Sequence, residues 1–304
     1  MSTFRTAVVR STPAGPEAIE IIHVPIVEPG HGDVRIRVAA APVNPVDIGV
    51  AGGRFHAMGL VNQPERTGLG WDFAGTVVAT APDVDVDLGT RVAGMVSGFD
   101  RDFGTYAEQL VVPASDLAVV PEGLDLVAAS TVPLNGLAAA QIVDLLGDAP
   151  AGGNRLLVTG AAGAVGGYVA SLAPDRGWQV TGLARAEDEE FVHSIGAEFT
   201  TDAERGWDAV ADGAVLQEQG LALVRDGGVF VGVQPSAVPD TERGIRVVAV
   251  VAHPDRQRLE GLLARTVSGE LPVRVHSVVP LDQVAVAHEA VAKGGVRGRY
   301  VLKP

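Results

Sequence analysis

Cysteine is absent from this chain of 304 residues. Its absence excludes disulfide bonds, thiol nucleophiles and every metal site that depends on cysteine ligands. The sequence also lacks an apolar run long enough to span a membrane, and the N-terminal MSTFRTAVVR has no signal-peptide core. We therefore expect a cytoplasmic protein.

Basic charge is scarce in this chain. Only 23 Lys and Arg residues stand against 37 Asp and Glu residues, which gives a formal net charge of −14. Nucleic acids and anionic membranes both require a basic binding face, so neither is the expected partner. Aromatic residues make up only 5% of the chain, whereas 38 glycines and 19 prolines lie scattered between apolar runs and indicate many turns.

The most informative segment is LLVTGAAGAVGGYVASLA, residues 156–173. Its apolar start is typical of a buried strand, and residues 165–173 can form a helix. Between them Gly160, Gly163 and Gly166 predict a tight turn. Backbone N–H groups and the positive helix end would converge there on one point, which suits a pyrophosphate. A tight turn without a ligand is the alternative.

The rest of the chain divides into two patterns. Short apolar runs separated by turn clusters occupy residues 1 to about 120, and their irregular spacing predicts a partly open antiparallel β-barrel. From Pro121 helix-forming residues follow, which Pro133 divides into two segments. Strand and helix patterns then alternate, which is the signature of a doubly wound parallel sheet. We predict an α/β protein of two domains.

Six motifs in this order resemble the medium-chain dehydrogenase/reductase superfamily, in its zinc-free quinone oxidoreductase branch, the zeta-crystallin-like proteins. They are AAPVNPVDIGVAGGRF at 40–55, GWDFAGTV at 70–77, GTYAEQLVVPA at 104–114, VTGAAGAVG at 158–166, RDGGVFVGV at 225–233 and the tail PLDQVAVAHEAVAKGGVRGRYVL. The resemblance implies a GroES-like β-barrel domain at 1–120, completed by 271–304, and a Rossmann NADPH-binding domain at 121–270. Members of this branch are usually dimers, so we expect a homodimer built on the apolar run Arg246–Ala252.

The resemblance also implies that no metal is bound. In the alcohol dehydrogenase branch, a cysteine and a His-Glu pair hold a catalytic metal in two N-terminal segments. Here Asn44 stands in place of the cysteine, Trp71 in place of the histidine and Asp72 in place of the glutamate. An amide and an indole do not form a zinc site.

The expected second strand of the Rossmann domain ends in GLARAEDE, residues 182–189. An NAD-binding chain places Asp or Glu there on the ribose 2′-hydroxyl, whereas Arg185 can bind a 2′-phosphate, so we predict NADPH. A solvated arginine paired with Glu187 and Asp188 is the alternative. The residues expected at the cofactor are Gly160, Ala162, Gly163, Ala164, Val165, Gly166, Arg185, Gly232, Val233 and Asn135, of which Asn135 could instead cap a helix.

Three residues are candidate catalytic groups. The resemblance implies a proton-donating tyrosine after the Gly52–Gly53 pair, where this chain has no hydroxyl. His56 follows closely and either acts as an acid near neutral pH or lies in solvent. We expect Asn44 to hydrogen-bond the nicotinamide ribose or the substrate oxygen. Asp47 either belongs to the site or caps a turn or helix.

A site without a Lewis acid favours substrates that delocalise the charge left by hydride transfer, as quinones and conjugated enones do. We therefore predict a zinc-independent, NADPH-dependent reductase of small-molecule quinones or α,β-unsaturated carbonyl compounds. The alternatives are a tailoring reductase or cyclase of secondary metabolism, which acts on one polyketide-like intermediate, and a non-catalytic NADPH-binding protein. Residues 55–63 and 98–103 are expected to determine the substrate.

Overall fold

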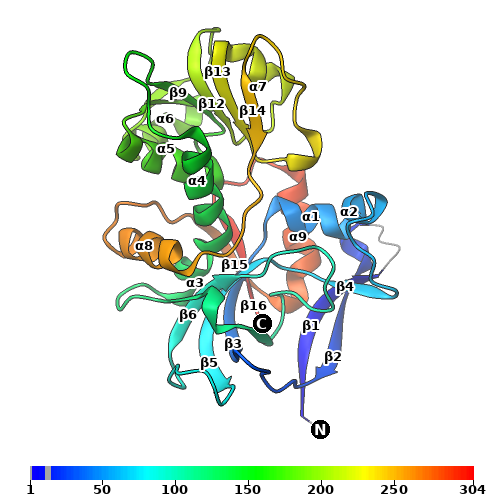
Figure 1. The fold of residues 1–304 in the computed structure, drawn as a ribbon. Helices are drawn as coiled ribbons and strands as arrows, with labels where there is room; N and C mark the ends of the chain where they lie inside the picture. The colour runs from blue at the N-terminus through cyan, green and yellow to red at the C-terminus, as the bar shows by residue number, and fades with distance from the viewer. Residues whose placement is uncertain (1, 11–14) are drawn as a thin grey trace. The chain divides into compact units, whose positions relative to one another are not determined.

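The computed structural model describes residues 2–10 and 15–304. The chain divides into two compact units (Figure 1). Unit 1 comprises Met1–Leu134, Pro254–Ala264 and Val273–Pro304, and unit 2 comprises Asn135–His253 and Arg265–Pro272. Compact units and family domains need not share boundaries, so the predicted domain limits stay a prediction.

Unit 1 is built mainly from β-strands. Its elements are β1 (Thr3–Arg10), β2 (Ile19–Pro25), β3 (Asp33–Pro42), α1 (Pro45–Ala51), α2 (Arg54–Ala57), β4 (Arg66–Gly68), β5 (Asp72–Thr80), β6 (Arg91–Met95), β7 (Gln109–Pro113), β8 (Leu117–Val119), α3 (Leu126–Ser130), β15 (Val275–Pro280), α9 (Val284–Lys293) and β16 (Arg299–Lys303). One sheet has the order β2-β1-β4, and a larger one has the order β15-β16-β3-β5-β6-β8, with β7 also paired to β3.

The central strand of the larger sheet shows why these residues form strands. Val34, Ile36 and Val38 alternate along β3 and are buried, whereas Arg35 and Arg37 between them are not. This alternation places one face of β3 in the core, where Phe73 of β5 is also fully buried. Burial of each large apolar side chain stabilises the fold by about 1.5–3 kcal/mol.

The C-terminal tail completes the larger sheet of unit 1 (Figure 1). β16 pairs antiparallel with β3 through Val301 opposite Pro42 and Leu302 opposite Ala41. β15 then pairs parallel with β16 and lies at the edge of the sheet. The first and last parts of the chain therefore share one sheet.

Unit 2 is a parallel sheet with helical connections. Its strands and helices are β9 (Arg155–Thr159), α5 (Ala164–Leu172), β10 (Gln179–Leu183), α6 (Glu189–Ser194), β11 (Glu198–Thr200), β12 (Trp207–Asp212), α7 (Glu218–Leu223), β13 (Val224–Gly232) and β14 (Arg246–Ala249). Two further helices, α4 (Pro133–Leu146) and α8 (Arg256–Val267), have residues in both units.

The strands of unit 2 follow the order β11-β10-β9-β12-β13-β14, and every neighbouring pair is parallel. Leu156, Leu157 and Val158 of the central strand β9 have no exposed surface, as expected for a strand covered on both faces. The chain winds outward in one direction from β9 and in the other from β12. Ligands of such sheets bind outside the carboxyl ends of the strands at this switch point.

The predicted α/β class with a doubly wound parallel sheet is confirmed. Pro133 divides the helical stretch as predicted, because α3 ends at Ser130 and α4 begins at Pro133. The sequence did not predict the short helices α1 and α2 or the edge strand β15.

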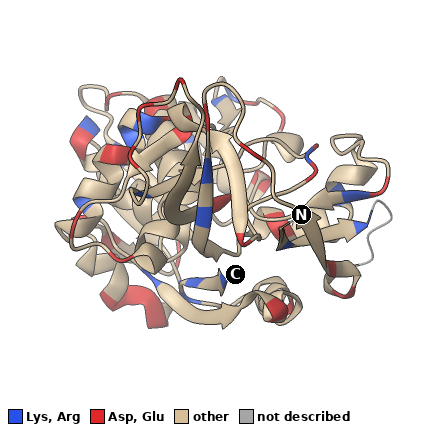
Figure 2. Cartoon of the chain, turned by 90° about the horizontal axis from the view of Figure 1, so that it is seen from below, with Lys and Arg blue, Asp and Glu red and all other residues tan. Residues whose placement is uncertain are grey.

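No helix in the described part of the chain is long and apolar enough to cross a membrane. Figure 2 shows Lys and Arg residues interspersed with Asp and Glu residues along the ribbon. Many of these charges pair, as Arg5 does with Glu108 and Arg225 with Asp208. The expectation that a nucleic acid is not the main partner stays a prediction.

Candidate functional site

The glycine turn joins the carboxyl end of β9 to the N-terminus of α5. Gly160 has a φ of 63°, a left-handed conformation that favours glycine. A Cβ atom on Gly166 would lie 2.3 Å from the Gly160 carbonyl oxygen, so only glycine allows this close approach of strand and helix. The sequence prediction of a strand, a tight turn and a helix is therefore confirmed in unit 2.

The N-terminus of α5 presents bare backbone. Gly163 is the N-cap residue and offers no side-chain cap, while Ala164 and Val165 are only partly buried. The first N–H groups of a helix have no acceptor within the helix, and the helix dipole adds positive potential there. The turn thus has the space and the donors that a pyrophosphate group needs. Direct cofactor contacts of these residues stay a prediction.

Arg185 follows the carboxyl end of β10, the strand beside β9. Its side chain is 62% exposed, and its guanidinium nitrogen lies 3.9 Å from a carboxylate oxygen of Glu187. Such an exposed ion pair contributes little to stability. Arg185 can therefore leave Glu187 and bind a phosphate with only a small loss of free energy from the broken ion pair.

The loop after β12 lies at the switch point and was not predicted from the sequence. Asp212 is buried, accepts a hydrogen bond from Thr159 Oγ1 (2.5 Å) and binds the backbone N–H groups of Leu216 and Gln217. These bonds hold two non-glycine residues at positive φ, Val215 at 60° and Gln217 at 55°. Strained backbone of this kind clusters at functional sites, where surrounding contacts enforce it.

Gln217 links this loop to the end of β13. Its Nε2 atom lies 3.3 Å from Gln234 Oε1, close in sequence to the predicted cofactor residues Gly232 and Val233. A polar residue thus lies at or just beyond the carboxyl end of each of β9, β10, β12 and β13, namely Thr159, Arg185, Asp212 and Gln234. Asn135 lies in the first turn of α4 and is 3% exposed, and its expected role at the nicotinamide stays a prediction.

Asn44 and Asp47 form a capping box at the N-terminus of α1. The Asn44 side chain accepts from the Asp47 backbone N–H, and the Asn44 backbone N–H donates to Asp47 Oδ2 (2.9 Å). Asp47 also accepts from the Gly70 backbone N–H (3.0 Å) and the Tyr106 hydroxyl (2.8 Å). Both side chains are almost fully buried, at 1% and 0% exposed. These contacts favour the capping role of Asp47, and a catalytic role of either residue stays a prediction.

Asp72 is a second buried carboxylate beside this box. It accepts hydrogen bonds from Asn44 Nδ2 (2.8 Å) and from the Leu134 backbone N–H (3.3 Å). Burial raises the pKa of Asp72 to about 7 and that of Asp47 to about 6, because the charged forms lose their hydration. The hydrogen bonds from Asn44 and Tyr106 oppose these upward shifts.

Two residues of this network carry no catalytic signal in the sequence. Tyr106 is fully buried, and burial together with Asp47 raises its pKa well above 10. Arg101 donates to the carbonyl oxygens of Gly70 (2.5 Å) and Val96 (3.1 Å), and burial lowers its pKa to about 10. The GTYAE motif that contains Tyr106 supports the family resemblance but does not indicate a role for this side chain.

His56 lies on the single-turn helix α2 in a partly buried position. Both ring nitrogens are covered and have no hydrogen-bond partner among the described residues. Burial lowers the pKa of His56, because the charged imidazolium form loses hydration. The structure thus does not place His56 in bulk solvent, and its catalytic role stays a prediction.

Phe55, the residue before His56, belongs to a group of three aromatic rings. Phe55 of α2 stacks on Phe99, with ring centroids 4.0 Å apart and an angle of 26° between the planes. Phe99 packs edge-on against Trp71 at 5.1 Å, and the Arg101 guanidinium lies 4.8 Å from the Trp71 ring centroid. The two segments expected to determine the substrate, 55–63 and 98–103, therefore meet through the Phe55–Phe99 stack.

The residues that stand where a zinc site would be do not fit zinc. The Asn44 amide is hydrogen-bonded to Asp72, and an indole offers no metal-binding lone pair. Among the described residues no cluster of three or more His, Cys, Asp or Glu could hold a metal ion. The metal content of the protein stays a prediction.

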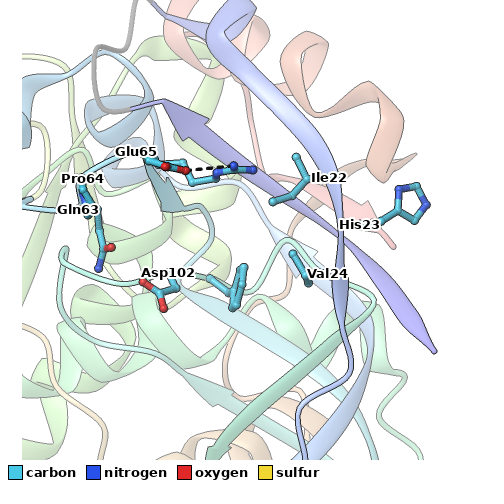
Figure 3. Close-up of a pocket in the computed structure, with 9 residues that line it drawn as sticks. Ile22, His23, Val24, Gln63, Pro64, Glu65 and Asp102 are labelled. Carbon is cyan, nitrogen blue, oxygen red and sulfur yellow. Dashed lines mark hydrogen bonds and ion pairs between the residues drawn. The ribbon is translucent and has the colours of Figure 1, made fainter. Parts of the chain in front are cut away.

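A surface cavity of about 420 Å³ lies elsewhere in unit 1 (Figure 3). Ile22 and Val24 of β2 form one wall, and Gln63 and Asp102 come from the two loops described above. Glu65 pairs with Arg66 at 3.4 Å along the rim. The cavity contains none of the predicted site residues.

Family comparison covers most of the chain. Residues 30–122 match the family described as "Alcohol dehydrogenase GroES-like domain", and residues 187–302 match the family described as "Zinc-binding dehydrogenase". The first match confirms the expected GroES-like domain.

Individual proteins show the same relationship. "Probable zinc-binding oxidoreductase, mitochondrial" from Arthroderma benhamiae is 30% identical over 267 residues, which cover 79% of this chain and 80% of the relative. "NADPH-dependent alkenal/one oxidoreductase, chloroplastic" from Arabidopsis thaliana is 29% identical over 290 residues, covering 89% and 72%. The quinone oxidoreductase of Coxiella burnetii has the same fold, with a TM-score of 0.87, 23% identity and complete coverage of both chains.

Proposed function

Because the chain belongs to the medium-chain dehydrogenase/reductase superfamily and is an oxidoreductase of that family, we propose that it reduces quinones or α,β-unsaturated carbonyl compounds with NADPH and without zinc. The observation that carries this proposal is the bare glycine turn between β9 and α5. Gly166 packs closely against the Gly160 carbonyl, and the N-cap residue Gly163 has no side chain to cover the helix N-terminus, which suits a phosphate. The nicotinamide cofactor, when bound, supplies the hydride.

The choice of NADPH rests on Arg185. This arginine lies at the carboxyl end of β10, where an acidic residue would select the ribose 2′-hydroxyl of NADH. A guanidinium matches a phosphate in charge and in hydrogen-bond geometry. The NADPH dependence named for the Arabidopsis relative supports the same choice.

The substrate class follows from the residues that replace zinc ligands. Asn44 and Trp71 cannot polarise a carbonyl as a metal does, so the substrate itself must delocalise the developing charge. Conjugated carbonyls and quinones do so, and the names of the Arabidopsis and Coxiella proteins fall in these two classes. Tyr106 and Arg101 maintain the buried scaffold around this segment.

The first test measures cofactor affinity by calorimetric titration. We expect NADPH to bind more tightly than NADH. Arg185→Ala should reduce the ratio of the NADH to the NADPH dissociation constant by about tenfold or more, since a charge-assisted phosphate contact contributes roughly 1.5–3 kcal/mol. The matched control is Arg205→Ala, which removes an exposed arginine paired with Asp226. Arg205 lies just before β12, so it is near the amino ends of the strands and not near the carboxyl ends, where Arg185 lies. Equal affinities for the two cofactors in wild type would refute the choice of NADPH.

The second test measures NADPH oxidation with cyclohexenone and with duroquinone as acceptors. Turnover with either one supports the reductase proposal. Tight NADPH binding without turnover on a broader set of enones and quinones would instead favour a non-catalytic NADPH-binding protein.

A further inference from the structure

Trp71 has an unmatched hydrogen-bond donor in the interior of unit 1. Its side chain is 6% exposed, and its indole N–H has no acceptor among the described residues. The indole N–H of Trp178, by contrast, donates to the Gly147 carbonyl oxygen at 2.9 Å. A buried donor without a partner has lost its hydrogen bonds to water without replacement, which is unfavourable, so each such group in a native structure calls for an explanation.

The rest of Trp71 is held firmly. Its backbone carbonyl accepts from the Val96 N–H at 2.7 Å, and the next residue, Asp72, is bonded to Asn44. Arg101 lies over the indole and Phe99 packs against it edge-on. The indole is therefore fixed in orientation while its N–H alone lacks a partner, as expected for a preorganised donor.

Two surface segments contribute the aromatic rings next to Trp71. Phe99 belongs to the loop between β6 and β7, and its stacking partner Phe55 belongs to α2. Both rings are only partly buried, unlike Trp71. The covered imidazole of His56, beside Phe55, is also without a hydrogen-bond partner among the described residues. Arg101 Nε, on the guanidinium over Trp71, is a further buried polar atom without a partner among the described residues. The stacked rings of Phe55 and Phe99 belong to surface segments that loop motion can displace.

We propose that the indole N–H of Trp71 is the hydrogen-bond donor to the carbonyl oxygen of a planar conjugated substrate, which reaches it by displacing the Phe99 ring. This inference rests on the proposed reductase function. A flat conjugated ring replaces the aromatic contacts that Phe99 gives up, so quinones and cyclic or aryl enones fit better than short aliphatic enals. Trp71 is then a catalytic residue.

The reaction step balances as follows for an enone. Hydride adds to the β-carbon, and the C=C electron pair moves toward the carbonyl group. Negative charge then collects on the carbonyl oxygen, which accepts the hydrogen bond from the Trp71 indole N–H. Water then donates a proton to the α-carbon, so that enone, NADPH and one proton give the saturated ketone and NADP⁺. The indole keeps its own proton throughout, since it acts only as a donor.

The kinetic test compares Trp71→Phe with Trp178→Phe, using cyclohexenone and duroquinone. Trp71→Phe keeps a ring but removes the N–H, so we expect kcat to fall about 10- to 1,000-fold with a small change in KM. Trp178→Phe should leave kcat unchanged. An active wild type whose Trp71→Phe variant retains full kcat would overturn this inference and leave the proposed function intact, whereas an inactive wild type would remove both.

A spectroscopic test uses the wild-type protein and so does not depend on folding of the variant. The chain has three tryptophans, and hence three indole N–H signals in heteronuclear NMR spectra. Addition of duroquinone to the NADP⁺ complex, in which no hydride is available, should shift the Trp71 signal and leave those of Trp178 and Trp207 in place. A stationary Trp71 signal at saturating duroquinone would overturn the inference.

A third experiment tests whether the Phe99 ring shields the Trp71 indole N–H from solvent. Phe99→Ala should speed the exchange of the Trp71 indole proton with solvent, whereas Phe4→Ala should not, because Phe4 packs on Phe103 in a separate cluster of unit 1. Unchanged exchange in Phe99→Ala would contradict the displacement of Phe99.

Discussion

The buried polar residues of unit 1 form hydrogen bonds that cannot be predicted from the sequence. Asn44, Asp47 and Asp72 could all be singled out from their motifs. Their mutual hydrogen bonds, however, depend on contacts such as Tyr106 with Asp47, which are 59 positions apart in the chain. Periodicity shows which residues face a core but does not show which polar groups meet there. The sequence thus indicated the segment, and the structure shows a buried carboxylate pair.

The stability of the protein should depend on pH through Asp72. Folding raises the pKa of this carboxyl from 3.8 to about 7, so the folded protein binds the proton more tightly than the unfolded chain. Its contribution is complete below pH 3.8 and is lost as pH rises to about 7, at up to about 1.4 kcal/mol per pH unit. We expect Asp72→Asn to make the decline of unfolding free energy with pH shallower, measured by urea unfolding across that range. The contribution of Asp47, whose pKa burial raises to about 6, remains.

The matched control for Asp72 is Asp85→Asn, an exposed carboxylate on the loop after β5. Its stability profile should run parallel to that of the wild type. Parallel profiles for Asp72→Asn and the wild type would show that burial does not perturb Asp72 in this way.

Helices and strands could be predicted from the sequence where they depend on residues close together in the chain, and not where they depend on distant contacts. The β9–turn–α5 unit could be predicted because its apolar run, glycines and helix lie within eighteen consecutive residues. The helices α1 and α2 span only seven and four residues, so no helical period can be recognised. The edge strand β15 depends on pairing with β16, and Val215 adopts a positive φ that a β-branched residue normally avoids.

The glycine turn should tolerate no side chain at Gly166. In Gly166→Ala the added methyl group would lie 2.3 Å from the Gly160 carbonyl oxygen, which forces strand and helix apart. We expect weaker NADPH binding, by about tenfold or more, and a loss of roughly 1–3 kcal/mol in unfolding free energy, as for overpacked sites. Calorimetric titration and urea unfolding measure the two effects.

Gly261→Ala is the matched control, since a Cβ atom there meets nothing within 4 Å in the middle of α8. This change should leave NADPH binding unaltered and add about 0.5–1 kcal/mol of stability, the usual helix preference of alanine over glycine. Gly166→Ala with wild-type affinity and stability would show that the turn does not need this close approach.

For the whole molecule, composition and order of motifs were enough to predict the class, because a doubly wound sheet repeats one local pattern many times. The substrate could not be predicted to the same depth. The proposed substrate contacts involve Phe55, Trp71 and Phe99, which come from three separate segments and meet only in the folded protein. Family membership likewise constrains the reaction class more than the acceptor.

An exposed edge strand in unit 2 is the basis for the expected association of two chains. β14 pairs with β13 on one side and lies at the end of the six-stranded sheet, with Val247 and Val248 only partly buried. Val251, two residues beyond the strand, is 69% exposed. An apolar edge strand invites pairing with a second chain. We therefore expect a homodimer joined through the run Arg246–Ala252.

Light scattering at micromolar concentration should then give about twice the chain mass of 31.3 kDa. Val248→Lys places a charge in the expected contact and should shift the protein toward monomer, because burial of an unpaired charge between two strands is unfavourable. Val278→Lys changes an exposed valine on β15, an edge strand of the larger sheet of unit 1, and should leave the dimer intact. A wild-type monomer would refute the dimer, and a Val248→Lys dimer would move the interface to another surface.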